Sequence, residues 1–281
     1  MNLNLNQVKK IVGGTYQGDE ALLNKKIKRI SINSKDIHKD DLFIGIKGEK
    51  FNGDLFASSA IQKGAIAAII STNQKDTKNK IIVKSGREAL GKLAQYWKSQ
   101  SKIPLVAITG SNGKTTTKEM IGSIVSSHLK SKKKLLMSQG NFNNDIGLPL
   151  SLLNIKKIQK CAVVEMGMNH KGEISYLSKI AIPDIAVITN IAEAHIEFFG
   201  SKKGIAKAKS EIFEGLKKDG TAIINRDDEF YSLMKNAART KKIISFGLNK
   251  KSDVYLKKTA QGISQIHTPK GSVNIKVKLQ G

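Results

Sequence analysis

A strand, glycine loop and helix pattern between Leu105 and Val125 constrains this chain more than any other feature of its sequence. An apolar run, residues 105–109, is followed by Gly-Ser-Asn-Gly-Lys-Thr-Thr at 110–116 and then by apolar residues at helical spacing. Glycines let backbone N–H groups close around an anion, and the positive end of the following helix adds to the attraction. The pattern predicts a phosphate-binding loop between a buried strand and a helix.

The predicted nucleotide site consists of the loop and the first residues of its helix: Gly110, Ser111, Asn112, Gly113, Lys114, Thr115 and Thr116. Lys114 would bring positive charge to the β- and γ-phosphates of ATP, and the Thr115 hydroxyl would ligate Mg²⁺. The general motif has four residues between its glycines, whereas this loop has only Ser111 and Asn112. The strand before it and the helix after it favour a nucleotide site over a plain surface turn.

Buried strands alternate with helical segments along the rest of the chain, which predicts an α/β fold. After the first strand, further apolar strands are expected at 161–165, 185–189, 221–224 and 243–246, an order typical of a parallel sheet. Residues 1–102 are predicted to form a smaller N-terminal α/β domain, and residues 103–281 a P-loop-type domain. Ligands of parallel sheets bind at the carboxyl ends of the strands, so polar residues there are the candidates for chemistry.

Composition argues against several classes of protein. The formal net charge is +25, but 44 of the 48 basic residues are lysine and aromatic residues make up only 5%. Bidentate base recognition and base stacking favour arginine and aromatic side chains, so we expect no nucleic-acid partner. No apolar run is long enough for a membrane span, and a single cysteine, Cys161, suits a reducing cytoplasm.

Two strand-end residues could bind a metal ion. Glu165 ends the strand 161–165, and it would face the phosphate loop and bind Mg²⁺ if the two strands are neighbours. His195 follows the strand 185–189, where it could be a metal ligand or a loop residue that makes ordinary hydrogen bonds. The sequence favours the metal role for Glu165 and leaves both roles open for His195.

Lys209 lies on the apolar stripe of a helix predicted over 204–216. It follows Ile205 by four residues and precedes Phe213 by four, whereas Lys207 points away from that stripe. Burial disfavours the charged amine and lowers its pKa. A neutral amine can react with CO₂ to give a carbamate, an anionic oxygen ligand for Mg²⁺. The alternative is a lysine whose ammonium reaches past the edge of the core to water.

Four sequence blocks in order resemble the Mur ligases. They are Gly-Ser-Asn-Gly-Lys-Thr-Thr-Thr-Lys-Glu at 110–119, Gly-Asn-Phe-Asn-Asn-Asp-Ile-Gly-Leu-Pro at 140–149, Glu-Met-Gly-Met-Asn-His-Lys-Gly-Glu-Ile at 165–174, and Ala-His-Ile-Glu-Phe-Phe-Gly-Ser at 194–201. The resemblance covers essentially the whole chain. Within the family, the block at 140–149 is most similar to the branch that adds D-alanyl-D-alanine to UDP-N-acetylmuramoyl-tripeptide.

The resemblance implies a cytoplasmic, ATP-dependent ligase of peptidoglycan precursor synthesis that acts through an acyl phosphate. It implies that Thr115 and Glu165 bind one Mg²⁺, that His195 and a carbamylated Lys209 bind a second, and that Lys114, His195 and Lys209 are catalytic. The N-terminal domain would bind the UDP end of the substrate. The implied substrate contacts come from loop residues that, taken alone, indicate only turns: Ser34, Lys47, Asn141 and Asn144. A monomer is expected.

Two departures from the family and two alternatives qualify this prediction. Asn33-Ser34-Lys35 stands where the family usually has Asp-Ser-Arg, and lysine lacks the guanidinium fork. Family members continue well beyond Gly281, so we expect an incomplete central domain that does not complete catalysis alone. The alternatives are a sister ligase that adds diaminopimelate or lysine to the UDP-muramoyl-dipeptide, and a non-catalytic nucleotide- or nucleic-acid-binding module.

Overall fold

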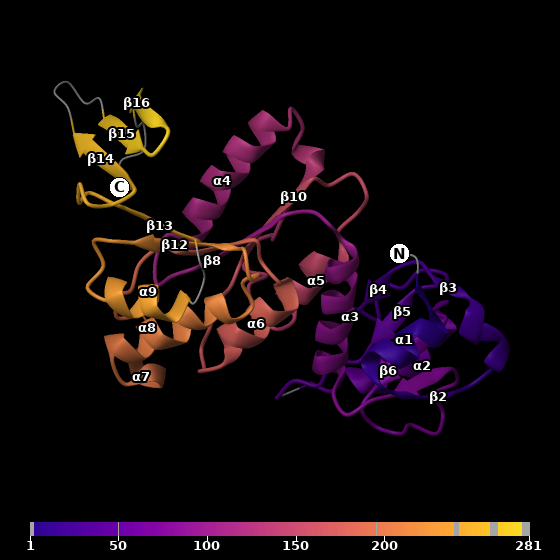
Figure 1. Cartoon of the computed structure of the whole chain (residues 1–281). Coiled ribbons are helices and arrows are strands. Elements are labelled where there is room, and N and C mark those ends of the chain that lie inside the picture. Colours follow the sequence, from indigo (N-terminus) through magenta and orange to yellow (C-terminus); the bar gives the residue numbers. More distant parts are fainter. Residues whose placement is uncertain (1–2, 50, 195, 239–241, 259–263, 277–281) are drawn as a thin grey trace. The chain divides into compact units, whose positions relative to one another are not determined.

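The chain forms two compact units in the computed structural model, which describes residues 3–49, 51–194, 196–238, 242–258 and 264–276. The first unit comprises Met1–Ser101 and Leu152–Asn154, and the second comprises Lys102–Ser151 and Ile155–Gly281 (Figure 1). Each unit has its own β-sheet with helices packed against it, which confirms the predicted α/β class.

The first unit consists of short strands and helices. In chain order they are β1 (Leu3–Asn4), α1 (Leu5–Val12), β2 (Thr15–Gln17), the 3₁₀ helix η1 (Glu20–Asn24), β3 (Lys26–Ile27), β4 (Ile30–Ser31), β5 (Leu42–Ile44), the 3₁₀ helix η2 (Gly53–Phe56), α2 (Ala57–Gln62), β6 (Ala67–Ile70), β7 (Lys80–Ile82) and α3 (Gly86–Gln100).

Its five-stranded sheet has the order β2-β7-β6-β5-β4, with β4 to β7 parallel and β2 antiparallel to β7. Residues of β5 and β6 are buried throughout, as expected for central parallel strands. Ser85 begins α3 by accepting a hydrogen bond from the Glu88 backbone N–H at 3.3 Å, which satisfies one of the free donors at the start of the helix.

The remaining elements belong to the second unit, except that the last two residues of α5 are counted with the first unit. They are β8 (Leu105–Thr109), α4 (Lys114–His128), the 3₁₀ helix η3 (Lys132–Lys134), β9 (Leu135–Met137), α5 (Gly147–Leu153), β10 (Cys161–Glu165), α6 (Glu173–Ala181), β11 (Ile185–Ile188), α7 (Ile196–Phe199), α8 (Lys202–Ser210), the 3₁₀ helix η4 (Glu211–Glu214), β12 (Thr221–Asn225), α9 (Tyr231–Ala238), β13 (Lys242–Gly247), β14 (Val254–Lys258), β15 (Ser264–Thr268) and β16 (Gly271–Ile275).

The sheet of the second unit has the order β16-β15-β14-β13-β12-β11-β8-β10-β9. The strands from β9 to β14 are parallel, and β15 and β16 extend the sheet as antiparallel strands. Figure 1 shows α4 on one face of this sheet and α6, α8 and α9 on the opposite face. Both faces of the central strands are therefore covered, which explains why their sequences are continuous apolar runs.

The strand order places a topological switch point at β8. From β8 the chain passes beyond β10 to form β9, returns to form β10, and then crosses to β11 on the other side of β8. Connections leave in opposite directions at such a point, and the gap at the carboxyl ends of the strands is where ligands of open parallel sheets bind. The phosphate loop follows β8 and therefore lies at this edge.

Two details differ from the sequence expectations. The helix predicted over 204–216 ends at Ser210 and continues as the 3₁₀ helix η4. Of the apolar residues at helical spacing on α4, Ile121 and Val125 pack against the core of the sheet, whereas Ile124 is 70% exposed. None of the described helices is both long and apolar enough to cross a lipid bilayer.

Candidate active site

The loop Gly110–Gly113 turns sharply from β8 into α4, and its two glycines are required by its backbone. Gly110 has φ +153° and Gly113 has φ +76°, in the region that L side chains rarely adopt. A Cβ on Gly110 would lie 1.8 Å from Oγ1 of Thr189, whereas the space beside Gly113 is open. The first glycine therefore permits close packing against the end of β11, and the second permits the turn into the helix.

Residues that follow β11 hold the loop in shape. The Ser111 N–H donates to the Asn190 carbonyl at 2.9 Å, and its hydroxyl donates to the Ala192 carbonyl at 3.1 Å. The Asn112 N–H donates to Asn190 Oδ1 at 3.0 Å, and the Asn112 carbonyl accepts from Thr189 Oγ1 at 2.7 Å. These hydrogen bonds hold both residues that lie between the glycines, in a loop two residues shorter than the general motif.

The start of α4 has the properties of an anion site. Gly113 provides no side-chain cap, and the first backbone hydrogen bond of the helix runs from Thr117 to the Gly113 carbonyl. The N–H groups of Lys114, Thr115 and Thr116 therefore have no partner within the helix, and the helix dipole adds positive potential there. A phosphate group would satisfy these donors.

The Lys114 ammonium folds back over the loop and donates to the carbonyls of Gly110 at 2.8 Å and Ser111 at 3.2 Å. Partial burial lowers the pKa of Lys114, and the nearby charge of Glu165 acts in the opposite direction. The ammonium is thus close to the space in front of the loop, where a phosphate oxygen could replace the carbonyl contacts.

Thr115 and Glu165 lie together, as expected for the case in which the strands that precede them are neighbours. β10 is the direct neighbour of β8, and Thr115 Oγ1 donates to Glu165 Oε2 at 3.1 Å. Two adjacent ligands of an octahedral Mg²⁺ with bonds of about 2.1 Å lie about 3 Å apart, so the two oxygens have the spacing that the ion needs. Glu165 is 2% exposed, and its Oε1 accepts no hydrogen bond from the described residues. This carboxylate fits a magnesium ligand.

Lys209 is buried near the end of α8, which confirms the expected burial on the apolar stripe. The residue is 3% exposed, whereas Lys207 on the same helix is exposed. Burial, and to a smaller extent the nearby charge of Lys114, lower the pKa of Lys209 to about 7. Within the described part of the chain, its ammonium has no hydrogen-bonding or ion-pair partner. A large fraction of this amine is therefore neutral and nucleophilic near pH 7.

The structure describes only one of the two residues predicted to bind a second Mg²⁺, Lys209. His195 lies outside the described residues, so its predicted metal role stays a prediction. Among the residues that are described, no group of three or more histidine, cysteine, aspartate or glutamate side chains is arranged to hold a metal ion. A site for Mg²⁺ at the phosphate loop would have to combine Thr115 and Glu165 with oxygens from the nucleotide and water.

The loop before α5 carries two predicted substrate residues. Asn144 Oδ1 accepts hydrogen bonds from the N–H groups of Ile146 at 3.2 Å and Gly147 at 2.8 Å, so its carbonyl oxygen serves the start of α5. Asn141 is exposed, and its backbone carbonyl accepts from the Asn143 N–H at 2.7 Å. The substrate roles of both side chains stay predictions, and for Asn144 only the amide NH₂ is available to a ligand.

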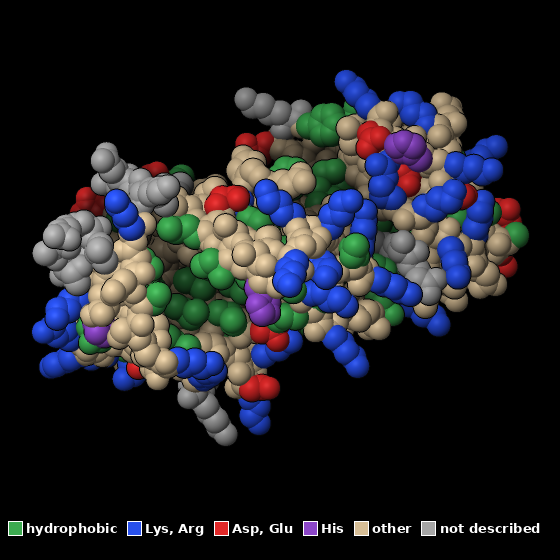
Figure 2. Space-filling view, turned by 90° about the horizontal axis from the view of Figure 1, so that it is seen from above, with side chains coloured by type: hydrophobic (Ala, Val, Ile, Leu, Met, Phe, Trp, Pro, Cys, Tyr) green, Lys and Arg blue, Asp and Glu red, His purple; other side chains and the backbone are tan. Residues whose placement is uncertain are grey.

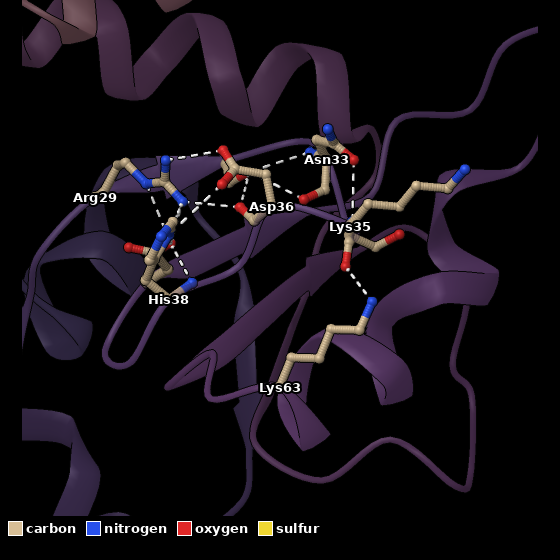
Figure 3. A network of polar contacts seen from close by, with 9 residues as sticks. Arg29, Asn33, Lys35, Asp36, His38 and Lys63 are labelled. Atoms are coloured by element: carbon tan, nitrogen blue, oxygen red, sulfur yellow. Dashed lines mark hydrogen bonds and ion pairs between the residues drawn. The ribbon is translucent and has the colours of Figure 1, made fainter.

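In the first unit, hydrogen bonds hold the turn that contains Ser34, and Figure 3 shows its neighbours Asn33 and Lys35 together with Lys63. Lys63 Nζ donates to the Ser34 carbonyl at 3.0 Å, and the Lys35 N–H donates to Asn33 Oδ1 at 3.0 Å. The Ser34 hydroxyl has no partner among the described residues. The Ser34 hydroxyl is therefore available to a ligand. Its role in binding the UDP end of the substrate stays a prediction.

Arg29 supports this turn, a role that the sequence did not reveal. Its guanidinium contacts Asp36 Oδ2 at 3.0 Å, the buried carboxylate of Asp41 at 2.7 Å and His38 Nδ1 at 2.7 Å (Figure 3). Lys47, the other predicted substrate residue of this unit, is exposed, and its carbonyl accepts from Arg87 Nε at 3.4 Å. Its substrate role also stays a prediction.

A second residue without a role in the sequence interpretation is Lys118, although it lies inside the block 110–119. It follows Lys114 by four residues on α4, and its Nζ lies 3.1 Å from Glu165 Oε1. Spacing by four could have placed it on the same helix face as Lys114. Only the strand order shows that Glu165 lies opposite.

Family models match both units. The model described as Mur ligase family, catalytic domain, matches residues 26–98, and the model of the Mur ligase middle domain matches residues 108–281. A UDP-N-acetylmuramoyl-tripeptide–D-alanyl-D-alanine ligase of Buchnera aphidicola (subsp. Baizongia pistaciae) is 38% identical over 290 residues, which cover 100% of this chain and 62% of the relative.

Solved structures agree with these matches. MurF from Acinetobacter baumannii superposes with a TM-score of 0.90 at 35% identity, covering 100% of this chain and 62% of that chain. MurF ligase from Thermotoga maritima in complex with ADP has a TM-score of 0.78 at 34% identity and covers 89% of this chain and 58% of that one. The chain spans about 60% of the length of the relatives that it matches.

Proposed function

This chain belongs to the Mur ligase family. On that premise we propose that it is part of an enzyme that joins D-alanyl-D-alanine to UDP-N-acetylmuramoyl-tripeptide and hydrolyses ATP to ADP and phosphate in doing so. The printed names of the relatives support this branch of the family. The observation that carries the proposal is the pairing of Thr115 with Glu165 beside the uncapped start of α4.

The proposed reaction has two steps. The γ-phosphoryl group of ATP passes to the terminal carboxylate of the tripeptide, which gives ADP and an acyl phosphate. The amine of D-alanyl-D-alanine then attacks the acyl carbon, the amide bond forms, and inorganic phosphate leaves with its electron pair while the amine loses a proton. Both steps build up negative charge on phosphoryl oxygens, and stabilising that charge is the main task of the site.

The residues of the phosphate loop would divide this task. The N–H groups that begin α4 would bind phosphate oxygens, and Lys114 would exchange its contacts with loop carbonyls for contacts with the β- and γ-phosphates. Thr115 and Glu165 would hold Mg²⁺, which neutralises charge on the phosphoryl group. The complex of the Thermotoga maritima relative with ADP supports ATP as the nucleotide.

For Lys209 we propose a carbamate. The neutral amine attacks the carbon of CO₂, an N–C bond forms, and one proton is released to solvent. The product is an anionic oxygen ligand, and with His195 it would hold a second Mg²⁺. Supporting this proposal are the burial of Lys209, its pKa of about 7 and its lack of a described partner. Bicarbonate labelled with ¹³C should give a carbamate signal by NMR that is missing in Lys209→Ala.

For the substrates we propose contacts from exposed loops. Ser34 and Lys47 of the first unit would bind the UDP end, and Asn141 and Asn144 would contact the peptide substrate. The free hydroxyl of Ser34 and the free amide NH₂ of Asn144 support these assignments. Ser34→Ala should weaken binding of the UDP-linked substrate and leave ADP binding unchanged.

The central test is calorimetry with ADP in the presence and absence of Mg²⁺. We expect Mg²⁺ to strengthen binding, and Lys114→Ala to lose at least tenfold in affinity with an unchanged circular dichroism spectrum. Absence of any magnesium-dependent nucleotide binding would refute the proposal. In a full-length version, phosphate release that requires the UDP-muramoyl-dipeptide and diaminopimelate or lysine, instead of the UDP-tripeptide and D-alanyl-D-alanine, would indicate the sister ligase.

A nucleic-acid-binding module is the alternative from another class. Figure 2 shows lysine and arginine side chains spread over the face in view, with acidic and uncharged side chains between them. Binding to DNA or RNA that is tight and falls steeply with salt would favour this alternative. We expect only weak binding, because a scattered arrangement does not follow a phosphate backbone.

A further inference from the structure

Lys118 is a buried lysine beside the proposed magnesium site. It is 2% exposed, and it lies one turn after Lys114 on α4. Its Nζ donates to the Ser138 carbonyl at 2.9 Å and lies 3.1 Å from Glu165 Oε1 and 3.3 Å from Glu119 Oε1. This one ammonium therefore connects α4 with the ends of two neighbouring strands, β9 and β10.

The two oxygens of Glu165 face different partners. Oε2 accepts a hydrogen bond from Thr115 Oγ1, and Oε1 faces the Lys118 ammonium without accepting a hydrogen bond from it. The Glu165 backbone N–H donates to Ser138 Oγ at 3.2 Å, so Ser138 holds both the glutamate and, through its carbonyl, the lysine. The carboxylate is thereby fixed with one defined oxygen toward Thr115.

Lys118 also lines an open pocket that does not include Glu165. An open pocket of about 640 Å³ lies beside α4 and β9, and Lys118, Glu119 and Ser138 are among the residues that line it. Glu165 is not among the described residues of that lining. Lys118 therefore borders both the pocket and the buried Glu165, whereas Thr115, on the other side of the carboxylate, is exposed.

We infer that Lys118 is a positioning residue for Glu165, which directs Oε2 toward Thr115 and the place where Mg²⁺ would be bound. The inference rests on the proposed function, because it concerns the same magnesium site. Burying a lysine against a glutamate is costly, and such a pair is weak evidence of stabilisation. Groups that orient a metal ligand affect metal affinity about 10- to 100-fold, and Lys118 contacts the ligand in that way.

The test is the ratio of ADP affinities measured by calorimetry with and without Mg²⁺. In Lys118→Met, which keeps length and loses charge, we expect this ratio to fall about tenfold, with magnesium-free ADP affinity changed by less than about twofold. Lys118→Arg should retain most of the ratio. Glu119→Gln is the matched control, because it removes an exposed charge that also contacts Lys118, and it should behave like the wild type.

Three results separate the possibilities. A ratio that is unchanged in Lys118→Met overturns the inference, and so does a ratio that rises, since the lysine would then compete with the metal. Equal loss of affinity with and without Mg²⁺ also overturns it, because that result indicates a structural role. Should Lys118→Met not fold, Lys118→Gln carries the same expectation. A wild type without any magnesium effect contradicts the proposed function itself.

Discussion

Replacement of Lys209 by methionine tests whether the fold holds this amine in a low-dielectric environment. Methionine has a similar length and no charge, so it removes the titration and keeps most of the packing. The pKa of Lys209 falls from 10.5 to about 7, first because of burial and second because of the charge of Lys114. At every pH between these two values the unfolded chain binds more protons at this site than the folded chain does.

The sign and size of the effect follow from this difference. Stability rises with pH wherever the unfolded state binds more protons, so the wild type should gain stability as the pH rises from about 7 toward 10.5 and lose that gain progressively as the pH falls back to about 7. The full shift corresponds to about 5 kcal/mol. In the accessible window from pH 7.5 to 8.5, the free energy of unfolding should rise by about 1.2 kcal/mol relative to Lys209→Met.

Urea unfolding followed by circular dichroism at pH 7.5, 8.0 and 8.5 measures this difference. The buffers must be free of CO₂, because a carbamate would remove the amine from the titration. Subtracting the profile of Lys209→Met cancels the other lysines, and Lys207→Met on the exposed face of α8 is the control that should follow the wild type. Parallel profiles of the wild type and Lys209→Met would refute the reasoning, since the amine would then titrate as it does in water.

Three further predictions concern the phosphate loop and the turn that contains Ser34. Gly110→Ala should reduce ADP affinity at least tenfold, because its Cβ would lie 1.8 Å from Thr189 Oγ1; unchanged affinity in calorimetry would contradict this packing. Gly113→Ala meets no neighbouring atom and should cost only about 1 kcal/mol through its φ of +76°, so a loss above about 3 kcal/mol in urea unfolding would contradict it. Arg29→Ala should destabilise the first unit by about 2 kcal/mol, because buried Asp41 loses two hydrogen bonds from the guanidinium. Arg29→Lys should not restore these bonds, because lysine lacks the forked guanidinium group. An Arg29→Lys variant as stable as the wild type in urea unfolding would contradict this role.

Local patterns in the sequence were sufficient for several features. Continuous apolar runs located β8, β10 and β11, since strands buried on both faces have no polar alternation. Helical spacing identified Lys209 as buried, although the helix that carries it ends at Ser210 rather than at 216. The loop 110–116 was recognisable because glycine positions, lysine and the flanking elements are adjacent in the chain.

Contacts between distant segments could not be read in this way. Hydrogen bonds that hold Ser111 and Asn112 come from residues 81 and 78 positions away, just after β11. The support that Arg29 gives to the Ser34 turn depends on three side chains whose orientations no periodicity specifies. Such contacts follow from the way elements pack together, which spacing along one element does not record.

The sequence by itself determined the α/β class, the phosphate loop and the burial of one lysine, because each depends on residues within a single element or turn. Only the tertiary structure decided that Glu165 lies opposite Thr115, fifty residues away, and that Lys118 lies behind it. That arrangement requires β10 to lie beside β8, with β9 outside it. Strand order is set by the packing of the whole sheet, and the apolar runs of its strands are too alike to specify their neighbours.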